Sequence, residues 1–295
     1  MLMGRHFLFD NVLQELKKGK VDVQILKHSQ KYDPPNMMTL SIHQSMLSFI
    51  KTGVTTFEHY KTLSIHQSML SFIKTGVTTF EHYKSFLVQH TTSDICNEIQ
   101  TLTKLQHKSD LWHEMWYGRI TASKAYAIPH CHTPDGTLVE TIFGSYKVPD
   151  TRAMKRGRLL ESRVLDKLRM SLSKNILCFG LVICQKYPFI SATPDGIGEN
   201  FVVEIKCPAS TKAFRNYIQN NEISEKCKAQ VQLQMYATKK LECIFCVADA
   251  DFEKTEEIHI MHIKYDENYV NKMLSVLEIF WKDNIFPKLY NSLKM

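Results

Sequence analysis

Two acids and a lysine stand close together in the stretch SATPDGIGENFVVEIKCP, which runs from Ser191 to Pro208. Asp195 belongs to a turn-forming Pro-Asp-Gly, and Glu204 and Lys206 follow it inside an apolar run. Two unpaired carboxylates are costly to bury together, and each raises the pKa of the other. A Mg²⁺ ion removes both problems, and its bound water can attack phosphorus while the ion offsets charge on the phosphate oxygens. The set therefore indicates metal-dependent phosphoester hydrolysis, with Lys206 orienting the water or stabilising the same charge.

The elements that must position these residues are a strand and a hairpin. The segment from Phe201 to Cys207 is rich in β-branched residues, which favours a strand. Side chains alternate along a strand, so Glu204 and Lys206 share one face. The run GIGEN fits a hairpin loop, which would return Asp195 to the side of Glu204. The alternative is a surface hairpin with an ordinary Glu/Lys pair.

A third acid, Glu161, lies on a helix predicted from Arg152 to Met170. Gly157, Val164, Leu165 and Leu168 all fall within about 60° of it on the helix, at 100° per residue. The acid therefore lies in the middle of the apolar face, where it either pairs inward with an arginine or binds metal. Seven basic residues on the same helix form a solvated face or attract a phosphate backbone: Arg152, Lys155, Arg156, Arg158, Arg163, Lys167 and Arg169.

A second TPDG, at Thr133 to Gly136, provides an internal comparison. Glu140 follows it, but the residue two positions further on is Ile142, so no Glu-x-Lys is present. We interpret this first TPDG as a turn only.

The remaining pattern predicts an α/β domain with a mixed sheet. Expected helices cover WHEMW, the residues after a turn at Gly118 (capped by Thr121 or Ser123), 223–239, and a last helix capped by Asp266 and stopped by Pro287. Expected strands lie within 176–190, 241–248 and 256–264, and 129–150 is expected to be a loop. Gln230 and Gln232 lie on the helix 223–239, where polar groups could simply be exposed.

Five motifs now stand in order: WHEMWYGRITAS, GRLLE, SATPDG, VVEIKCP and KAQVQLQMYAT. In this order and approximate spacing they resemble the YqaJ-type viral recombinases, relatives of phage lambda exonuclease within the PD-(D/E)XK nuclease superfamily. The resemblance covers the chain from about Asp110 to Phe286. It implies a restriction-endonuclease-like core, in which a central mixed β-sheet is flanked by helices and preceded by a helical N-terminal region.

The resemblance also implies an activity. Members of the family hydrolyse DNA phosphodiester bonds with Mg²⁺, for which Mn²⁺ can substitute, in recombination or in viral and mobile-element replication. The phage relative digests one strand of a duplex from its 5′ end and is a ring-shaped trimer. The implied partners are therefore double-stranded DNA ends, further copies of the chain and a single-strand annealing protein, without a membrane. The alternative is a domesticated DNA-binding module of the same fold, with weak or lost catalysis.

Site residues carry over by position in the motifs. Asp195 and Glu204 look like metal ligands, with the carbonyl of Ile205 as a further one. Lys206 looks like the catalytic lysine, and Glu161 resembles the helix acid near the metals. The implied contacts to DNA are Ser123, Thr193, Gln230, Trp112 and Arg119.

One position departs from the family pattern. The family usually has an arginine four residues after the tryptophan that matches Trp112, but here that place is Trp116. An arginine appears three residues later, at Arg119. Either Arg119 takes over phosphate binding, or the preference for the 5′ end is altered.

The N-terminal part contains a tandem duplication outside the resemblance. TLSIHQSMLSFIKTGVTTFEHYK occupies residues 39–61 and again, letter for letter, 62–84. In the second copy Gly76 is expected to end a helix, and Thr78 with Glu81 to open the next one. We expect no separate function for the second copy. The predicted organisation is a helical region of unknown function over residues 1–108 and a YqaJ/lambda-exonuclease-like nuclease domain over 109–290.

Composition sets the broad class. The chain is 44% hydrophobic and 23% charged, which predicts a soluble globular protein, and its net charge of +7 weakly favours a polyanionic partner. No apolar run reaches the ~18 residues that span a bilayer. Eight scattered cysteines predict a reduced, intracellular protein, cytoplasmic or nuclear, without an iron–sulfur cluster. Cys243 and Cys246 fall three apart in a predicted strand, which favours buried thiols over zinc ligands, and the run from His130 to His132 is either a ligand cluster or a flexible loop.

Overall fold

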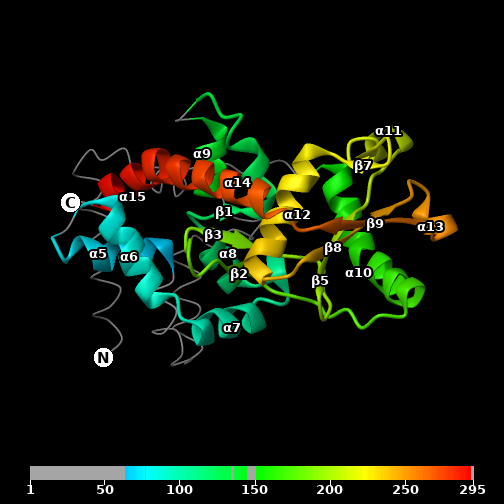
Figure 1. Ribbon diagram of the computed structural model, residues 1–295, viewed down its shortest axis with the longest axis horizontal. Helices are drawn as coiled ribbons and strands as arrows, with labels where there is room; N and C mark the ends of the chain where they lie inside the picture. The colour runs from blue at the N-terminus through cyan, green and yellow to red at the C-terminus, as the bar shows by residue number, and fades with distance from the viewer. Residues whose placement is uncertain (1–63, 77, 134–135, 145–150, 294–295) are drawn as a thin grey trace, which may run out of the picture.

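The computed structural model describes residues 64–76, 78–133, 136–144 and 151–293 (Figure 1). The first copy of the repeat lies outside the described residues. The described helices are α5 (Ile65–Ile73), α6 (Phe80–His90), α7 (Ser93–Leu102), α8 (Asp110–Trp116), α9 (Thr137–Ile142), α10 (Arg152–Leu172), α11 (Thr211–Phe214), α12 (Glu225–Thr238), α13 (Phe252–Thr255), α14 (Glu267–Phe280) and α15 (Phe286–Leu293). Shorter turns are η1 (Gln106–Lys108), η2 (Ala122–Ala127) and a π-helix, η3 (Trp281–Ile285). Of these helices, none combines the length and the apolar character needed to cross a bilayer.

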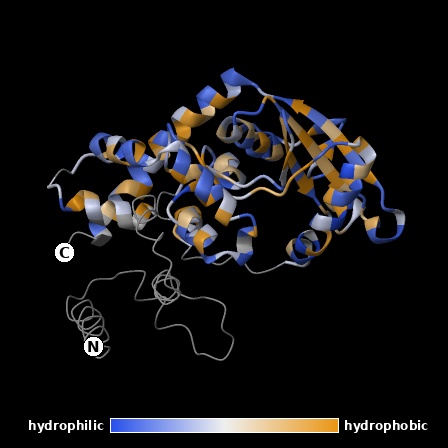
Figure 2. Cartoon of the chain, turned by 90° about the horizontal axis from the view of Figure 1, so that it is seen from below, coloured by the Kyte–Doolittle hydropathy of each residue, from blue (hydrophilic) through white to orange (hydrophobic). Residues whose placement is uncertain are grey.

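A four-stranded mixed sheet carries the acidic segment. Its strands, in spatial order, are β4 (Gly196–Ile197), β5 (Phe201–Lys206), β8 (Glu242–Ala248) and β9 (Ile258–Lys264). β5 and β8 are parallel, whereas β4 and β9 run antiparallel to their neighbours. The strands are largely hydrophobic in Figure 2, and the first five residues of β5 are buried, as expected for a strand covered on both faces.

Helices α10 and α12 cover the two faces of β5. Because side chains alternate, Val203 and Ile205 belong to a hydrophobic cluster with α10, and Val202 belongs to another with α12. The α10 residues of the first cluster are Leu160, Val164, Leu165 and Leu168, which is the predicted apolar face. The same alternation directs Glu204 and Lys206 toward α12.

A second, smaller sheet leads the chain into the first. Its strands are β1 (Ile120–Thr121), β3 (Ile190–Ala192) and β2 (Val182–Ile183), in that order. Only Thr193, Pro194 and Asp195 separate β3 from β4, so the two sheets meet at the acidic segment. A separate hairpin consists of β6 (Ile218–Gln219) and β7 (Glu222–Ile223).

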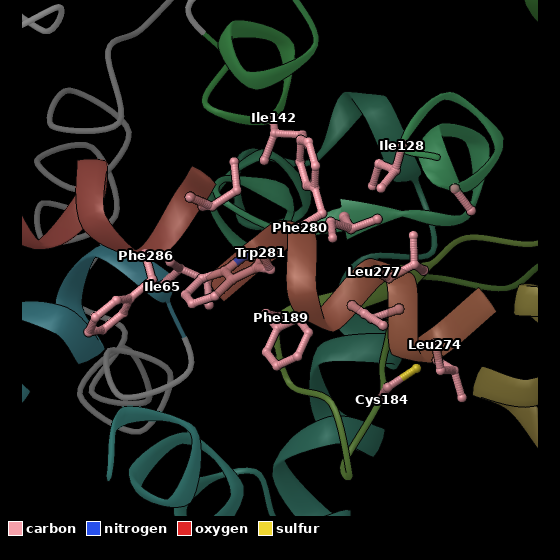
Figure 3. Close-up of a cluster of buried hydrophobic side chains, with 14 of the residues drawn as sticks. Ile65, Ile128, Ile142, Cys184, Phe189, Leu274, Leu277, Phe280, Trp281 and Phe286 are labelled. Carbon is pink, nitrogen blue, oxygen red and sulfur yellow. The ribbon is translucent and has the colours of Figure 1, made fainter. Parts of the chain in front are cut away.

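An aromatic cluster joins the N-terminal helices to the C-terminal ones; its members are Phe80, Tyr83, Phe189, Trp281 and Phe286. The Trp281 ring stacks on Phe189 at 5.1 Å and on Tyr83 at 6.0 Å, between ring centroids. Its Nε1 donates to the carbonyl of Gly118 at 2.8 Å. Figure 3 shows part of this core, and Figure 1 shows α5 and α6 beside α15. The second repeat copy therefore contributes to the core, while the predicted boundary at residue 108 stays a prediction.

The expected α/β class with a mixed sheet between helices is confirmed. The long helix at α10, strands β5, β8 and β9, and the Asp266 cap of α14 all lie where the pattern placed them. Gly76 follows α5 with a φ of +75°, as expected of a glycine that ends a helix.

Several local predictions were wrong. Thr79, not Thr78, caps α6, accepting from the amide of His82. The helix expected after Gly118 begins after Thr121, as predicted, but it is a 3₁₀ helix, η2, preceded by a short strand and without a side-chain cap bond. Helix α9 lies inside the expected loop. Pro287 does not stop the last helix, because it falls in the first turn of α15, where a proline is tolerated.

Candidate active site

Asp195 occupies an edge of strand β5 that β4 leaves open. The pairing between β4 and β5 covers only two positions, Gly196 with Val203 and Ile197 with Val202. Just beyond it, the Asp195 amide donates to the Val203 carbonyl at 3.0 Å. The Asp195 Oδ2 then accepts from the Ile205 amide at 2.6 Å. The expected hairpin is thus confirmed, and it brings Asp195 back beside the strand that carries Glu204.

Glu204 is held between a lysine and a helix. Its Oε1 accepts from the Lys206 ammonium and, at 2.6 Å, from Gln230 Nε2. Its Oε2 accepts from Gln234 Nε2, also at 2.6 Å. Lys206 Nζ in addition reaches Gln230 Oε1 at 3.2 Å. Glu204 itself is buried, so strand β5 and helix α12 together desolvate and fix this carboxylate.

Glu161 approaches from the other helix, α10. Burial raises its pKa, and the charge of Glu204 raises it further, while Lys206 acts in the opposite direction. The alternative of an inward ion pair with an arginine is not observed, since no ion pair to Glu161 occurs within the described residues. Glu161, Asp195 and Glu204, with Lys206, are called the acidic cluster below.

Asp195 has the most strongly perturbed carboxyl group of the cluster. Burial raises its pKa well above the ordinary range, and the charges of Glu204 and Glu161 add to this effect. The Lys206 ammonium and the hydrogen bond from the Ile205 amide oppose the rise without cancelling it. If all three carboxyl groups of the cluster ionised, they would carry more negative charge than Lys206 neutralises, so burial together with this repulsion favours a protonated Asp195.

The surroundings of Lys206 favour the charged form of its side chain. Burial alone would lower the pKa of its ammonium, but the carboxylates of Glu204 and Asp195 outweigh burial and raise it above the ordinary value. The side chain keeps 20% of its surface exposed. Lys206 is therefore a cation at neutral pH, able to donate hydrogen bonds and stabilise negative charge but not to accept a proton.

The acidic cluster fits a hard divalent cation. Mg²⁺ typically takes one or two carboxylates from the protein and keeps several waters, and Asp195 with Glu204 supplies such a pair. In the part of the chain that the structure describes, no group of three or more His, Cys, Asp or Glu side chains is arranged around a common metal position. Glu161 interacts with the pair through its charge, and its ligand role, like that of the Ile205 carbonyl, stays a prediction.

The expected DNA contacts lie in different settings. Thr193 Oγ1 accepts from Trp112 Nε1 at 3.1 Å, and both residues are half-buried. Ser123 is exposed in η2, which packs against α12. Gln230 contacts the acidic cluster directly, through its hydrogen bonds to Glu204 and Lys206. Contacts of these residues with DNA stay predictions.

Arg119 is placed differently from the phosphate-binding arginine expected of it. The side chain is 0% exposed, and its Nε donates to the carbonyl of Pro188 at 2.7 Å. A second donor of the guanidinium bonds the Met115 carbonyl. Burial lowers its pKa to about 10, and the charge of Glu114 opposes that shift. A guanidinium held by core carbonyls braces α8 against the chain before β3, so it cannot replace the missing family arginine in this conformation.

Trp116 occupies the place of that arginine. Its ring lies nearly parallel to that of Trp112, at 12° and 6.2 Å between centroids. Where the family pattern has a cationic arginine, this chain therefore has an aromatic residue, which pairs with Trp112 next to Thr193.

The prediction that Cys243 and Cys246 are buried thiols is confirmed. Cys243 and Cys246 are buried and lie in hydrophobic clusters on opposite sides of the sheet. Burial raises the pKa of the Cys246 thiol to about 12. Neither these thiols nor the run from His130 to His132 belongs to a metal-binding group within the described residues.

Helix α12 was predicted correctly, but Gln234 was missed and the burial of the glutamines on this helix was not predicted. Gln232 and Gln234 are each 1% exposed, although glutamines on this helix could have been solvated. Gln234 lies one helical turn after Gln230 and bonds the same carboxylate. The spacing of four between these glutamines was the signal available in the sequence.

Comparisons with known proteins give a family match and a shared fold. The family model of the YqaJ-like viral recombinase domain matches residues 89–240. The structure of LHK-Exo in complex with dAMP has a TM-score of 0.51 and 21% identity, covering 61% of this chain and 94% of that one. The structure of LHK-Exo, an alkaline exonuclease from Laribacter hongkongensis, has a TM-score of 0.49 and 20% identity, covering 61% and 91%.

The Shutoff and Exonuclease Protein from Kaposi's sarcoma associated herpesvirus has a TM-score of 0.47 and 10% identity, covering 92% of this chain and 90% of that one. No curated protein matches the chain. At 21% identity the similarity to LHK-Exo shows a shared fold, which is the fold class expected from the sequence. The family match spans half of the chain, and the five motifs fall within or beside it. The chain belongs to the YqaJ-like viral recombinase domain family.

Proposed function

We propose that the chain is a Mg²⁺-dependent exonuclease that hydrolyses phosphodiester bonds from the ends of double-stranded DNA, in recombination or in viral or mobile-element replication. The observation that carries the proposal is the acidic cluster, in which Asp195 and Glu204 converge next to a cationic Lys206. The reacting groups all lie in the predicted nuclease domain, residues 109–290. Family membership and the fold shared with LHK-Exo support the reaction class.

The residues have separable roles in this proposal. Asp195 and Glu204 would hold the ion, which when bound supplies an acidic water and offsets charge on the phosphate. Lys206 cannot act as the base while it is protonated, so it stabilises the negative charge that grows on the phosphate oxygens. Gln230 orients Lys206 and Glu204 at once, because its amide oxygen faces the first and its amide nitrogen the second.

The direct test is digestion of a linear duplex carrying a label at either the 5′ or the 3′ end. Progressive loss of label with Mg²⁺, absent in chelator, is the expected result, and the order in which the two labels disappear gives strand polarity. A closed circle should resist attack, whereas cutting of the circle would identify an endonuclease. A protein that binds the duplex but never shortens it, with Mg²⁺ or Mn²⁺, would instead be a DNA-binding module of the same fold.

Two partners follow from the family and are proposed with it. A processive end-dependent nuclease gains from encircling DNA, so we propose a homo-oligomer, a trimer by resemblance. The single strand left by digestion would be the substrate of an annealing protein. Mass measurement in solution, with and without duplex, tests the first of these.

A further inference from the structure

Helix α12 contacts the acidic cluster through two glutamines, and only one of them is explained by the proposed reaction. Gln230 and Gln234 are four residues apart, so they project from one face of the helix, one turn from each other. Each places its Nε2 at 2.6 Å from a different oxygen of Glu204. Both amides must present nitrogen to the carboxylate, because an amide oxygen there would face another acceptor.

The number of hydrogen bonds that the Glu204 carboxylate accepts indicates the role of Gln234. An ionised carboxylate accepts about four hydrogen bonds, two on each oxygen. Oε1 already accepts from Lys206 and Gln230, so its two positions are filled. Oε2 accepts from Gln234, and no second donor to it is found among the described residues. One lone pair of Oε2 therefore remains for a cation, and the bond from Gln234 fixes the direction in which that lone pair points.

The buried amide of Gln234 also lowers the stability of the folded chain. The side chain is 1% exposed, and its Oε1 is buried without a hydrogen-bond partner in the described residues. A buried acceptor left unsatisfied costs about 1–3 kcal/mol. Its remaining bond, from Nε2 to the Thr193 carbonyl, is long, at 3.5 Å. A residue kept only to hold α12 against the sheet would use both ends of its amide.

Gln232, two residues earlier, shows that contrasting pattern. It is equally buried, but its Nε2 donates to the Lys264 carbonyl at 2.7 Å, and its Oε1 accepts from the Asp266 amide at 2.9 Å. Both bonds go to backbone groups where β9 passes into α14. Gln232 thus connects α12 to the backbone between β9 and α14, whereas the short hydrogen bond of Gln234 goes to the Glu204 carboxylate.

We propose that Gln234 is a positioning residue of the metal site: it locks the Glu204 carboxylate so that the one remaining lone pair of Oε2 faces the ion. This inference rests on the proposed function, because it needs Asp195 and Glu204 to bind a cation. Partners that orient a ligand in this way typically change metal affinity by about 10- to 100-fold when they are removed.

The test measures ion binding by titration calorimetry, with Mg²⁺ and with Mn²⁺, on the whole chain without DNA. Gln234→Met keeps the length of the side chain and removes both amide groups, and it should weaken ion binding by about 10-fold or more. Without metal its thermal midpoint should fall less than that of Gln232→Met, because the loss of the donor to Glu204 Oε2 is partly offset by removal of the unsatisfied Gln234 acceptor. Gln232→Met, the matched control, should lower the thermal midpoint and leave the affinity for the ion unchanged.

A second variant guards against a folding defect. Gln234→Asn keeps the amide but retracts it by one methylene, so it should also lose affinity for the ion. At saturating Mg²⁺ both Gln234 variants should regain most of the cleavage rate, since the reacting groups are intact. Affinities equal to wild type in both variants would overturn the inference and leave the proposed function standing. A wild-type chain that binds neither ion would instead remove the proposed function itself.

Discussion

The aromatic cluster around Trp281 and the acidic cluster beside β5 are both buried, yet burial has opposite consequences in the two. In the aromatic cluster every ring contacts another ring, and the single polar group of Trp281 is satisfied by the Gly118 carbonyl. In the acidic cluster, burial raises the pKa of Asp195 and Glu161 and leaves a glutamine acceptor unpaired. The first region stabilises the fold, and the second is maintained at a cost in stability.

That difference predicts which substitutions affect stability and which affect activity. The acids of the acidic cluster can be replaced by neutral residues without unfolding the chain, whereas the stacked rings cannot be removed without a loss of stability. Four experiments test whether the two clusters differ in this way.

The largest effect is expected for the acidic cluster and concerns activity. Lys206→Ala and Asp195→Asn should each lower the rate of digestion of a linear duplex by about 10²- to 10³-fold or more, since charge stabilisation at the phosphate is lost. Asp195→Asn keeps an oxygen that can accept from the Ile205 amide and removes the repulsion from Glu204. Its thermal midpoint without metal should therefore equal or exceed that of wild type. A large drop in the midpoint would show that the acids stabilise the fold.

The next effect concerns stability. Trp281→Ala removes a fully buried ring that stacks on Phe189 and Tyr83. It should cost about 3–5 kcal/mol of unfolding free energy, a fall in thermal midpoint on the order of 10 °C. Leu159→Ala is the control, because Leu159 exposes 74% of its surface and its truncation should change little. Equal effects of the two substitutions would contradict the role given to the aromatic cluster.

The pH dependence of stability should separate the clusters further. The raised pKa of Asp195 means that the folded chain keeps a proton which the unfolded chain has released. Without metal, the free energy of unfolding should therefore fall as pH rises from the ordinary carboxyl pKa, about 4, through the raised folded value. Denaturant unfolding in chelator should show this slope in wild type and a smaller one in Asp195→Asn. Trp281→Ala should lower the free energy of unfolding by the same amount at every pH, so its curve against pH should run parallel to that of wild type. Mg²⁺ should reduce the slope of the wild-type curve.

The smallest effect is expected for the repeat. Removing residues 39–61 or 62–84 gives one and the same polypeptide, because the copies are identical. The remaining copy is still followed by Ser85, so the ring contacts of Phe80 and Tyr83 with Trp281 can be retained. Cleavage should stay near wild type, and stability should change by less than about 1 kcal/mol.

Removal of both copies is the control, because it deletes Phe80 and Tyr83 from the aromatic cluster and should prevent folding. Severe loss of cleavage on removal of a single copy, in a chain that still folds, would show that a second copy has a function of its own.

Much of the acidic cluster could be predicted from the sequence, because its elements are local. The β-branched residues of β5 favour a strand, a short hairpin returns Asp195 to that strand, and the 3.6-residue period places Glu161 on the apolar face of α10. These three steps need no knowledge of distant contacts. The fold class follows from the same local patterns.

The failures at Arg119, Gln234 and Pro287 depend on distant contacts, whereas the cap of α6 was misplaced by a single residue. Arg119 is satisfied by the carbonyl of Pro188, which no local pattern places beside it. A buried glutamine and a solvated one look alike along a helix, so the burial of Gln234 could not be predicted, and only its spacing of four from Gln230 pointed to a shared partner. The passage of the last helix through Pro287 follows a π-helical turn that packs Trp281 into the core, and hydrophobic periodicity does not predict such a turn.

The buried thiols bear on how the protein can be handled and labelled. Burial raises the pKa of Cys184 and Cys207 to about 12, as it does for Cys246, so almost no thiolate is present at neutral pH. Alkylating reagents and mild oxidants react with thiolates, and these sulfurs should resist both in the native state. Cys178, which lies on the surface, should be the first to take up a maleimide dye. A dye attached there would mark the segment that follows α10 without any engineered cysteine.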